Sequence, residues 1–519
     1  MNSLNSNGAD FVRGINFAIK KSGTNEETIK TSEAASTLAV VYEAARNAVE
    51  FRSEHLIRQA AIVRILRRRL FLGQSSGRLA PLLIRELIWA RYLKDDSVPI
   101  DKADEIEGII NKYRKALNST KDRDLGEWLL NLAGCEIEEA LVFNPYPQLL
   151  INFVAESLQP RIKIAGVTDE RVKDIQVYIA VERSFAKNSE IFITYHLLKA
   201  IFPEWLGSNA SDAIFSKLLD AKKEIDGNLE FPLATDVKRE VNTMTPPFNV
   251  IREMVIRNPE LFLKCVASKD DFDKSAKEVL EALYAENRGK LIRAETRSII
   301  YIFLTKMIFG LALELPFDLF VGRTNFLALF INLIFPPSLM FILNMGIKIP
   351  DGENTRRILE RMDEYIYGDD TPKAIEVGGR QKVESIFERI FAVVYGILFI
   401  GIFAVIIWGL NLLHFNPVSQ IIFLFFLCVV SFFAYRVKGI SRDYVYQEKT
   451  SGILLSLLDF LFLPAIKVGQ WLSSQISRLN VLGFIFDFII EAPLKAFLEV
   501  IEEWVRFVKA KKEEIFTEG

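Results

Sequence analysis

One uncharged run fixes the solvent in which part of this chain folds. Residues 391–410, FAVVYGILFIGIFAVIIWGL, are twenty residues without a charged side chain. A helix of that length spans about 30 Å, which is the thickness of the hydrocarbon core of a bilayer. A second uncharged run, residues 418–435, follows after a loop that holds no Lys or Arg. Two such neighbouring runs predict an integral membrane protein.

Charged residues are segregated along the chain. A quarter of the 519 residues are charged although half are apolar, and the long apolar runs follow residue 297. We therefore expect an all-α protein with a soluble part, a polytopic membrane part and an amphipathic helical tail. The predicted parts are a cytoplasmic helical domain (1–290), a first membrane hairpin (291–345), a cytoplasmic connector (346–389), a second membrane hairpin (390–436) and an interfacial tail (437–519).

The predicted cytoplasmic domain follows helical spacing. Residues 33–72 contain no Gly or Pro, and their apolar side chains recur three and four residues apart. The best short exception is Arg161–Val167, which favours a strand. Helix breaks are expected where Pro or Gly interrupts the pattern. These positions are Gly73–Gly77, Pro145/Pro147, Pro203, Asp226-Gly227 and Pro246-Pro247.

Basic residues in the short loops orient the membrane part. The four candidate spans are residues 298–314, 325–345, 391–410 and 418–435. The connector 346–389 holds eight Lys and Arg residues, the loop 411–417 holds none, and the loop 315–324 holds only Arg323. This alternation predicts a multi-pass protein of the cell membrane with both termini in the cytoplasm. The polar N-terminus, which lacks a secretory signal, agrees with that orientation.

The first hairpin is the weaker of the two. Lys306, in the middle of its first span, costs roughly 2.5 to 3.5 kcal/mol on an insertion scale and offsets the gain from neighbouring apolar residues. Pro336-Pro337 interrupts helical hydrogen bonds in the next span and predicts either a kinked span or a re-entrant hairpin. Two spans and four spans leave the termini on the same side, so charge does not separate these alternatives.

Polar residues at membrane depth are the main candidates for a functional site, because burying them there is costly. Lys306 and Glu314 share one helix face but lie about 12 Å apart along the axis, so we expect them not to pair directly. Asp318 follows one turn later, and Asn325 and Asn332 belong to the second span. These side chains would form a polar track for transport. In the structural alternative, Lys306 faces the bundle interior and the two acids lie at the outer headgroup level.

A basic segment lies on the helix predicted over residues 33–72. Its densest part contains Arg64, Arg67, Arg68 and Arg69, of which the first three share a helix face. One interpretation is contact with anionic lipid headgroups or RNA. The other is a solvated face whose arginines pair with acids elsewhere in the domain.

The tail has neither the pattern of a soluble domain nor an apolar run long enough to span a membrane. Ile453–Leu463 and Val481–Ile490 are apolar runs of about eleven residues, too short to cross a bilayer. Pro464 is expected to end the first run. One interpretation is a set of helices lying on the inner leaflet; the other is packing against the cytoplasmic domain.

No catalytic or cofactor signature occurs in the sequence. It contains no phosphate-binding loop, dinucleotide fingerprint, zinc-protease motif or hydrolase elbow. The three cysteines and three histidines are scattered, so neither a disulfide framework nor a metal site is suggested. A net charge of −2 disfavours a nucleic-acid partner. We expect no enzyme activity and no cofactor.

Three functions fit this organisation. The leading hypothesis is a membrane-anchored interaction or scaffold protein whose helical cytoplasmic domain binds protein partners. The first alternative is a small transporter or ion pathway, oligomeric because four spans seldom enclose a path alone, that uses the polar residues of the first hairpin. The second alternative is RNA or ribosome contact through Arg64–Arg69.

Overall fold

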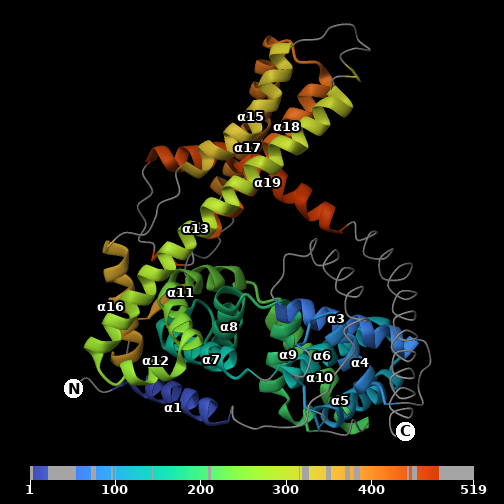
Figure 1. Ribbon diagram of the computed structural model, residues 1–519, viewed down its shortest axis with the longest axis vertical. Helices are drawn as coiled ribbons and strands as arrows, with labels where there is room; N and C mark the ends of the chain where they lie inside the picture. Colours follow the sequence, from blue (N-terminus) through green and yellow to red (C-terminus); the bar gives the residue numbers. More distant parts are fainter. Residues whose placement is uncertain are drawn as a thin grey trace, which may run out of the picture. The chain divides into compact units, whose positions relative to one another are not determined.

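The computed structural model describes most of the chain, and the account below is restricted to that part. The described residues are 4–21, 54–71, 78–94, 98–99, 101–142, 144–207, 212–314, 316–317, 326–345, 352–368, 374–378, 386–440, 444–446 and 453–478. Within them the chain is mostly helical, as the sequence predicted (Figure 1). The only sheet in these regions has two short strands.

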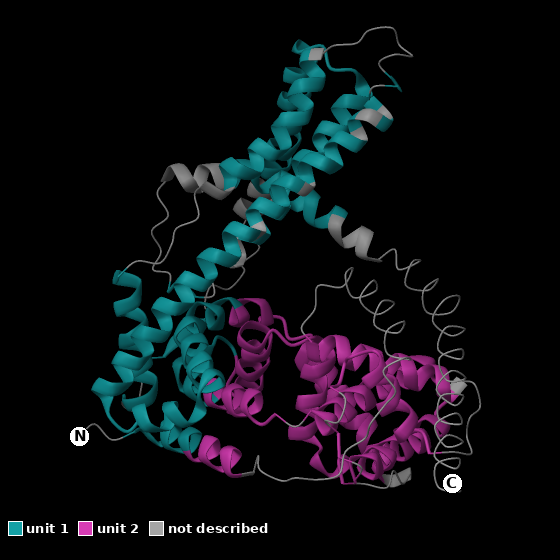
Figure 2. Cartoon of the chain, in the orientation of Figure 1, with its two compact units in different colours: residues 1–12, 156–166, 239–479 teal, residues 13–155, 167–238, 480–519 magenta. Residues whose placement is uncertain are grey.

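The chain divides into two compact units (Figure 2). Unit 1 comprises Met1–Val12, Glu156–Gly166 and Arg239–Leu479, and unit 2 comprises Arg13–Ala155, Val167–Lys238 and Asn480–Gly519. Each unit therefore combines segments that are distant in the sequence. The described part of the predicted tail up to Arg478 belongs to unit 1.

Unit 2 is built around α6 (Arg123–Leu141), which packs against α3 (Glu54–Phe71), α5 (Asp101–Asn118) and α9 (Glu190–Ile201). The core at these contacts is apolar, with both aliphatic and aromatic side chains, and Leu129 of α6 is fully buried in it. The Asp122 side chain accepts hydrogen bonds from two backbone N–H groups of the first turn of α6, which caps that helix. Further elements that lie wholly in unit 2 are α4 (Ala80–Trp89), α8 (Glu170–Val181), the π turn η2 (Glu182–Ala186), η3 (Pro203–Trp205) and α10 (Asp212–Leu229).

Helix α10 continues through Asp226-Gly227, where a break was expected, so that prediction was wrong. A glycine inside a helix costs only about 1 kcal/mol relative to alanine, and tertiary packing readily offsets that cost. Leu218 and Ile225 of α10 are fully buried and supply such packing. The break expected at Pro203 is confirmed, because α9 ends at Ile201.

The strand predicted within Arg161–Val167 is confirmed as β1 (Ile162–Ile164), in unit 1. Its partner is β2 (Ile375–Val377), which pairs with it in parallel with Ile162 opposite Ile375. These strands join residues of the predicted cytoplasmic connector to a segment more than 200 residues earlier in the chain. Unit 1 also contains η1 (Gln159–Arg161), α12 (Pro259–Cys265), α16 (Gly352–Tyr367) and nearly all of α11 (Ala234–Arg257). The boundary between the units falls within α1 (Ser6–Lys21) and α7 (Tyr146–Leu158), so that unit 1 holds the beginning of α1 and the end of α7.

Helix α11 runs through Pro246-Pro247, so the break predicted there was wrong. Proline lacks the N–H that would bond the carbonyl four residues earlier, which for Pro246 is the carbonyl of Asn242. The Thr245 hydroxyl donates a hydrogen bond to this carbonyl at 2.9 Å. One of the acceptors freed by the proline pair is thereby satisfied, and the helix continues.

The apolar bundle of unit 1 is entered by the longest helix, α13 (Lys269–Phe309), which continues as the π turn η4 (Gly310–Glu314). Its interior joins Ile302 of α13 to side chains of α15, α18 and α19, among them Met340, Val430 and Ala465. The other bundle helices are α15 (Phe326–Met345), α17 (Ile386–Leu412), α18 (Pro417–Ile440) and α19 (Ile453–Arg478).

Two bundle segments, Val393–Leu412 and Pro417–Val437, are long and apolar enough to cross a membrane. Shorter apolar stretches occupy Leu327–Leu343 of α15 and Phe460–Leu472 of α19. Half of the α18 segment is buried, whereas only 6% of the α17 segment is, so much of the apolar surface of α17 remains uncovered. Such a surface is compatible with a lipid environment.

Proline pairs and single prolines do not interrupt the bundle helices. Helix α15 is unbroken through Pro336-Pro337, so a re-entrant turn at this pair, one of the two expected outcomes, is wrong. Helix α19 likewise continues through Pro464, where the first tail run was expected to end.

Helix α19, at the start of the predicted tail, packs closely against α18. An added Cβ at Gly469 would meet the Cys428 carbonyl and would lie 2.7 Å from the Phe432 Cβ, both on α18. The two backbones therefore approach closely near the middle of α18. Small residues allow this approach between apolar helices.

Candidate functional site

The apolar bundle contains a buried ion pair. The Lys306 Nζ atom lies 2.5 Å from Glu314 Oε1, and each side chain is only 1% exposed. The expectation that these residues are too distant to pair directly was therefore wrong. Between them the α-helix changes to the π turn η4, whose i→i+5 hydrogen bonds alter the helical rotation, and the long stems of both side chains close the remaining gap.

Apolar and aromatic groups surround this pair. The ammonium group of Lys306 lies 5.0 Å from the centroid of the Phe426 ring on α18, within the range of a cation–π interaction. The pair is neutral as a whole, which lowers the cost of its burial. Removing one partner from such a pair leaves an uncompensated charge and costs about 3–5 kcal/mol.

Asn332 is fully buried on α15, but the structure connects it to α18 rather than to the ion pair. Its Nδ2 atom donates to the Ser419 carbonyl at 3.4 Å. Within the described part of the chain, its Oδ1 atom accepts no hydrogen bond. A buried carbonyl oxygen without a donor is costly, so it is a second unusual polar group in the bundle.

The other predicted members of the polar track cannot be joined to this pair. Asp318 and Asn325 lie outside the described residues. Pro336 and Pro337 lie inside α15. Of the residues predicted for the track, the structure brings together Lys306 and Glu314.

The arginines predicted to contact an anionic surface are engaged within unit 2. Arg67 forms an ion pair with Glu127 of α6 at 2.5 Å. Arg68 and Arg69 both bind Glu86 of α4, with Arg69 Nε donating to Glu86 Oε1 at 2.9 Å. Glu86 and Arg69 are 2% and 5% exposed, so these pairs form part of the packing between α3 and α4. Arg64, on the same helix, is also engaged in an interaction.

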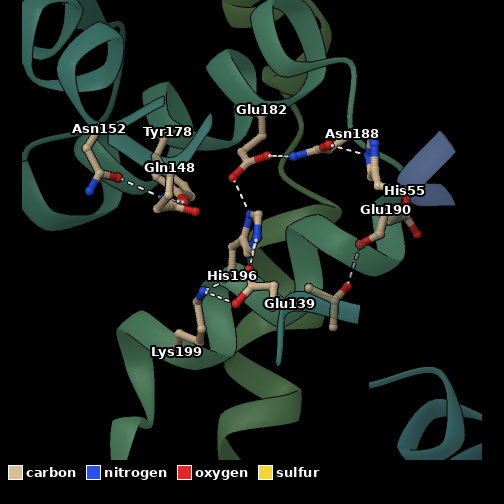
Figure 3. Close-up of polar contacts among 11 residues, drawn as sticks. His55, Glu139, Gln148, Asn152, Tyr178, Glu182, Asn188, Glu190, His196 and Lys199 are labelled. Carbon is tan, nitrogen blue, oxygen red and sulfur yellow. Dashed lines mark hydrogen bonds and ion pairs between the residues drawn. The ribbon is translucent and has the colours of Figure 1, made fainter. Parts of the chain in front are cut away.

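A buried polar network in unit 2 was not predicted (Figure 3). His196 of α9 lies between two carboxylates: its Nδ1 atom is 2.6 Å from Glu182 Oε1, and its Nε2 atom is 3.1 Å from Glu139 Oε1. Lys199, one turn along α9, donates to Glu139 at 2.8 Å. The Asn188 amide donates to Glu182 at 2.6 Å and also contacts His55 (Figure 3).

The carboxylates determine the charge of His196. Burial lowers the pKa of this imidazole, but its hydrogen bonds to Glu139 and Glu182 outweigh burial and raise the pKa to about 9. The ring is therefore an imidazolium at neutral pH, and both of its N–H groups donate. Glu182, which is fully buried, begins the π turn η2, a form of helix often found at functional sites.

Sequence patterns could not have revealed this network. Glu139, Glu182 and His196 are on separate elements with no fixed spacing, and only folding brings them together. Its full complement of partners indicates a structural role that fixes α6, η2 and α9 relative to one another. Among the described residues, no group of three or more His, Cys, Asp or Glu side chains is placed to hold a metal ion.

Comparisons with known proteins add no family to this description. Neither models of protein families, nor curated proteins, nor solved structures give a match to the chain.

Proposed function

We propose that this protein is an integral membrane scaffold, which anchors a helical cytoplasmic domain at the bilayer and offers it to protein partners. The observation that carries this proposal is α13. Its 41 residues extend about 60 Å without a break. It packs against α12 and α16 at one end and against α15 and α18 in the bundle at the other.

A second contact, between α16 and the helices of the apolar bundle, supports the same function. The Asn354 amide on α16 donates to the Tyr284 hydroxyl of α13 at 2.7 Å and to the Tyr444 carbonyl at 2.9 Å. The Tyr446 backbone N–H donates back to Asn354 Oδ1 at 2.8 Å. The buried Asn354 side chain thus connects α13, α16 and the segment that follows α18. These contacts restrain α16 relative to the bundle.

The proposed topology has four spans, with both termini in the cytoplasm and the protein in the cell membrane. The spans are α13 with η4, α15, α17 and α18. The alternation of basic and uncharged loops supports this orientation. Accessibility of single cysteines introduced at positions 320, 352, 415 and 445 tests it: labelling from outside at 320 and 415, with protection at 352 and 445, is expected. External labelling at 352 would contradict the four-span arrangement.

The scaffold requires partners that bind the cytoplasmic part. Photo-crosslinkers placed in the full-length protein at exposed Lys217 and Lys223 of α10 test this requirement in cells. A discrete protein adduct that is absent when the crosslinker replaces lipid-facing Ile400 is expected. Loss of adducts at every cytoplasmic position, together with ion flux through the purified protein, would contradict the scaffold.

An oligomeric ion pathway is the second candidate, favoured by the Lys306–Glu314 pair and by the unpartnered Oδ1 atom of Asn332. Intramembrane ionisable groups often belong to such pathways. The double variant Lys306→Met/Glu314→Gln removes both charges and would abolish flux in reconstituted vesicles if this function holds. Unchanged adduct formation by the same variant is expected if the protein is a scaffold.

A further inference from the structure

Three basic side chains gather on one face of α13. Lys290, Arg293 and Arg297 are exposed. At 3.6 residues per turn they lie within about 60° of one another around the helix. We call these three residues the basic face.

The same side of the helix becomes apolar immediately after the basic face ends. Ile300, Leu304 and Ile308 continue along it and are 53%, 48% and 61% exposed. The change occurs within three residues, about 5 Å of helix. Exposing these apolar side chains to water would be unfavourable. A bilayer boundary at this level would place the apolar side chains in lipid and the basic side chains among the headgroups.

The basic face carries surplus positive charge. Lys290 forms an ion pair with Glu286 at 2.8 Å, and Glu286 also binds Arg257 at 2.9 Å. Within the described part of the chain, Arg293 and Arg297 have no acidic partner in an ion pair. Glu295 lies on the opposite side of the helix, about 160° from Arg297.

A second helix contributes similar residues at the end of its apolar segment. Tyr435, 49% exposed, and Arg436, also exposed, lie near the end of α18. Leu291 of α13 packs against the apolar cluster that includes Val437 of α18. An aromatic ring beside a basic side chain at the end of an apolar segment is typical of the headgroup level of a membrane.

We propose that the basic face of α13, together with Arg436, binds the phosphate groups of anionic lipids in the cytoplasmic leaflet. This inference rests on the membrane position in the proposed function and adds the class of lipid to it. The apolar continuation at Ile300, Leu304 and Ile308 favours a lipid over a soluble phosphate, since it provides a surface for acyl chains. Each basic group near an anionic surface contributes roughly fivefold in affinity, so removing three would weaken binding about a hundredfold.

Delipidated full-length protein in a neutral detergent provides the test. Native mass spectrometry would count bound phosphatidylglycerol against phosphatidylcholine, and the thermal unfolding midpoint would be followed during the same titrations. We expect preferential retention of phosphatidylglycerol and a rise in the midpoint with that lipid alone. Both effects should be lost in Lys290→Gln/Arg293→Gln/Arg297→Gln and kept in Arg293→Lys/Arg297→Lys.

The matched control is Lys274→Gln/Lys277→Gln, which removes exposed basic residues from the same helix about 24 Å before Arg293. That distance exceeds the Debye length of about 8 Å at physiological salt, so the control should bind phosphatidylglycerol as the parent does. Equal retention of both lipids by the parent, or equal loss in the control, would overturn the inference. Displacement of the lipid by millimolar inorganic phosphate would overturn it in favour of a soluble anion. The scaffold function fails separately, if the protein is released from membranes without detergent.

Discussion

Lys306 and Glu314 form a 2.5 Å ion pair inside an apolar bundle, although eight residues separate them in the sequence. The pair lies across the junction between α13 and η4, so it fixes the end of the long helix. In an apolar interior the two charges depend on each other, because neither has water to solvate it.

Single replacements of this pair should destabilise the protein much more than the double replacement does. Lys306→Met alone and Glu314→Leu alone each leave one buried charge, and each should lower the free energy of unfolding by about 3–5 kcal/mol. The double variant should be close to the parent, since no charge then remains buried. Unfolding of the detergent-solubilised protein in sodium dodecyl sulfate, arranged as a double-mutant cycle, measures this coupling. Additive losses in the double variant would contradict a dependent pair.

The stability contributed by His196 should fall at alkaline pH. Its pKa in the folded protein is about 9, above the ordinary 6.5, because two carboxylates bind the imidazolium. The stabilisation is therefore complete below about pH 6.5, is on the order of 3 kcal/mol, and disappears as pH rises through 9. His196→Gln should lose stability at pH 6.5 but differ little from the parent at pH 10.

Isotope labelling of histidine gives a direct measurement of this shift. The chain contains three histidines, so a labelled sample yields few signals. One signal should titrate near pH 9 and disappear in His196→Gln. Burial lowers the pKa of His55, whose signal should titrate below the ordinary range. A spectrum with no histidine titrating above pH 8 would contradict the carboxylate-bound imidazolium.

The ionised Asp273 side chain, near the N-terminal end of α13, should lower the stability of the folded protein at neutral pH. Burial, and then the nearby Asp363 carboxylate, raise its pKa from 3.8 to about 6. Since the folded state holds the proton more tightly, this contribution is favourable below about pH 4 and is lost as pH rises through 6. Asp273→Asn should raise the thermal midpoint at pH 7.5 and lose most of that advantage at pH 4.5. Asp271→Asn, an exposed acid in the same turn, is the control and should show no such pH-dependent gain.

Gly469 should tolerate no side chain. An added Cβ would meet the Cys428 carbonyl and the Phe432 side chain, so Gly469→Ala forces α18 and α19 apart. We expect a loss of about 1–3 kcal/mol, as for other overpacked sites. Gly401→Ala on α17 adds the same methyl group where nothing lies within 4 Å, and should keep or raise stability. Thermal unfolding of both variants in detergent makes the comparison; equal effects would argue against the tight crossing.

Local patterns in the sequence predicted much of the secondary structure. Helical spacing and uncharged length identified the apolar helices, and an alternating pattern identified β1. Breaks were overpredicted at Asp226-Gly227 and Pro246-Pro247 because the intrinsic penalty of Gly or Pro is local. Buried leucine and isoleucine in α10, and the Thr245 hydroxyl in α11, compensate for it through contacts that no short window contains.

Sequence patterns could not predict the partners of the charged side chains, for a related reason. Coulomb energies depend on distances of a few ångströms and on burial, and both are set only after helices pack. Arg69 meets Glu86, and His196 meets Glu139 and Glu182, through contacts between different helices. The two strands that pair between Ile162 and Ile375 are likewise separated by more than 200 residues.

The sequence by itself determined the solvent preference of each segment, because the number of apolar side chains per helix turn is a local property of the chain. Tertiary structure alone decided which charges neutralise one another, where α19 crosses α18 and how α13 is held at its two ends. These features depend on packing between residues that are distant in the sequence. The interaction free energies that determine them arise only when those surfaces are in contact.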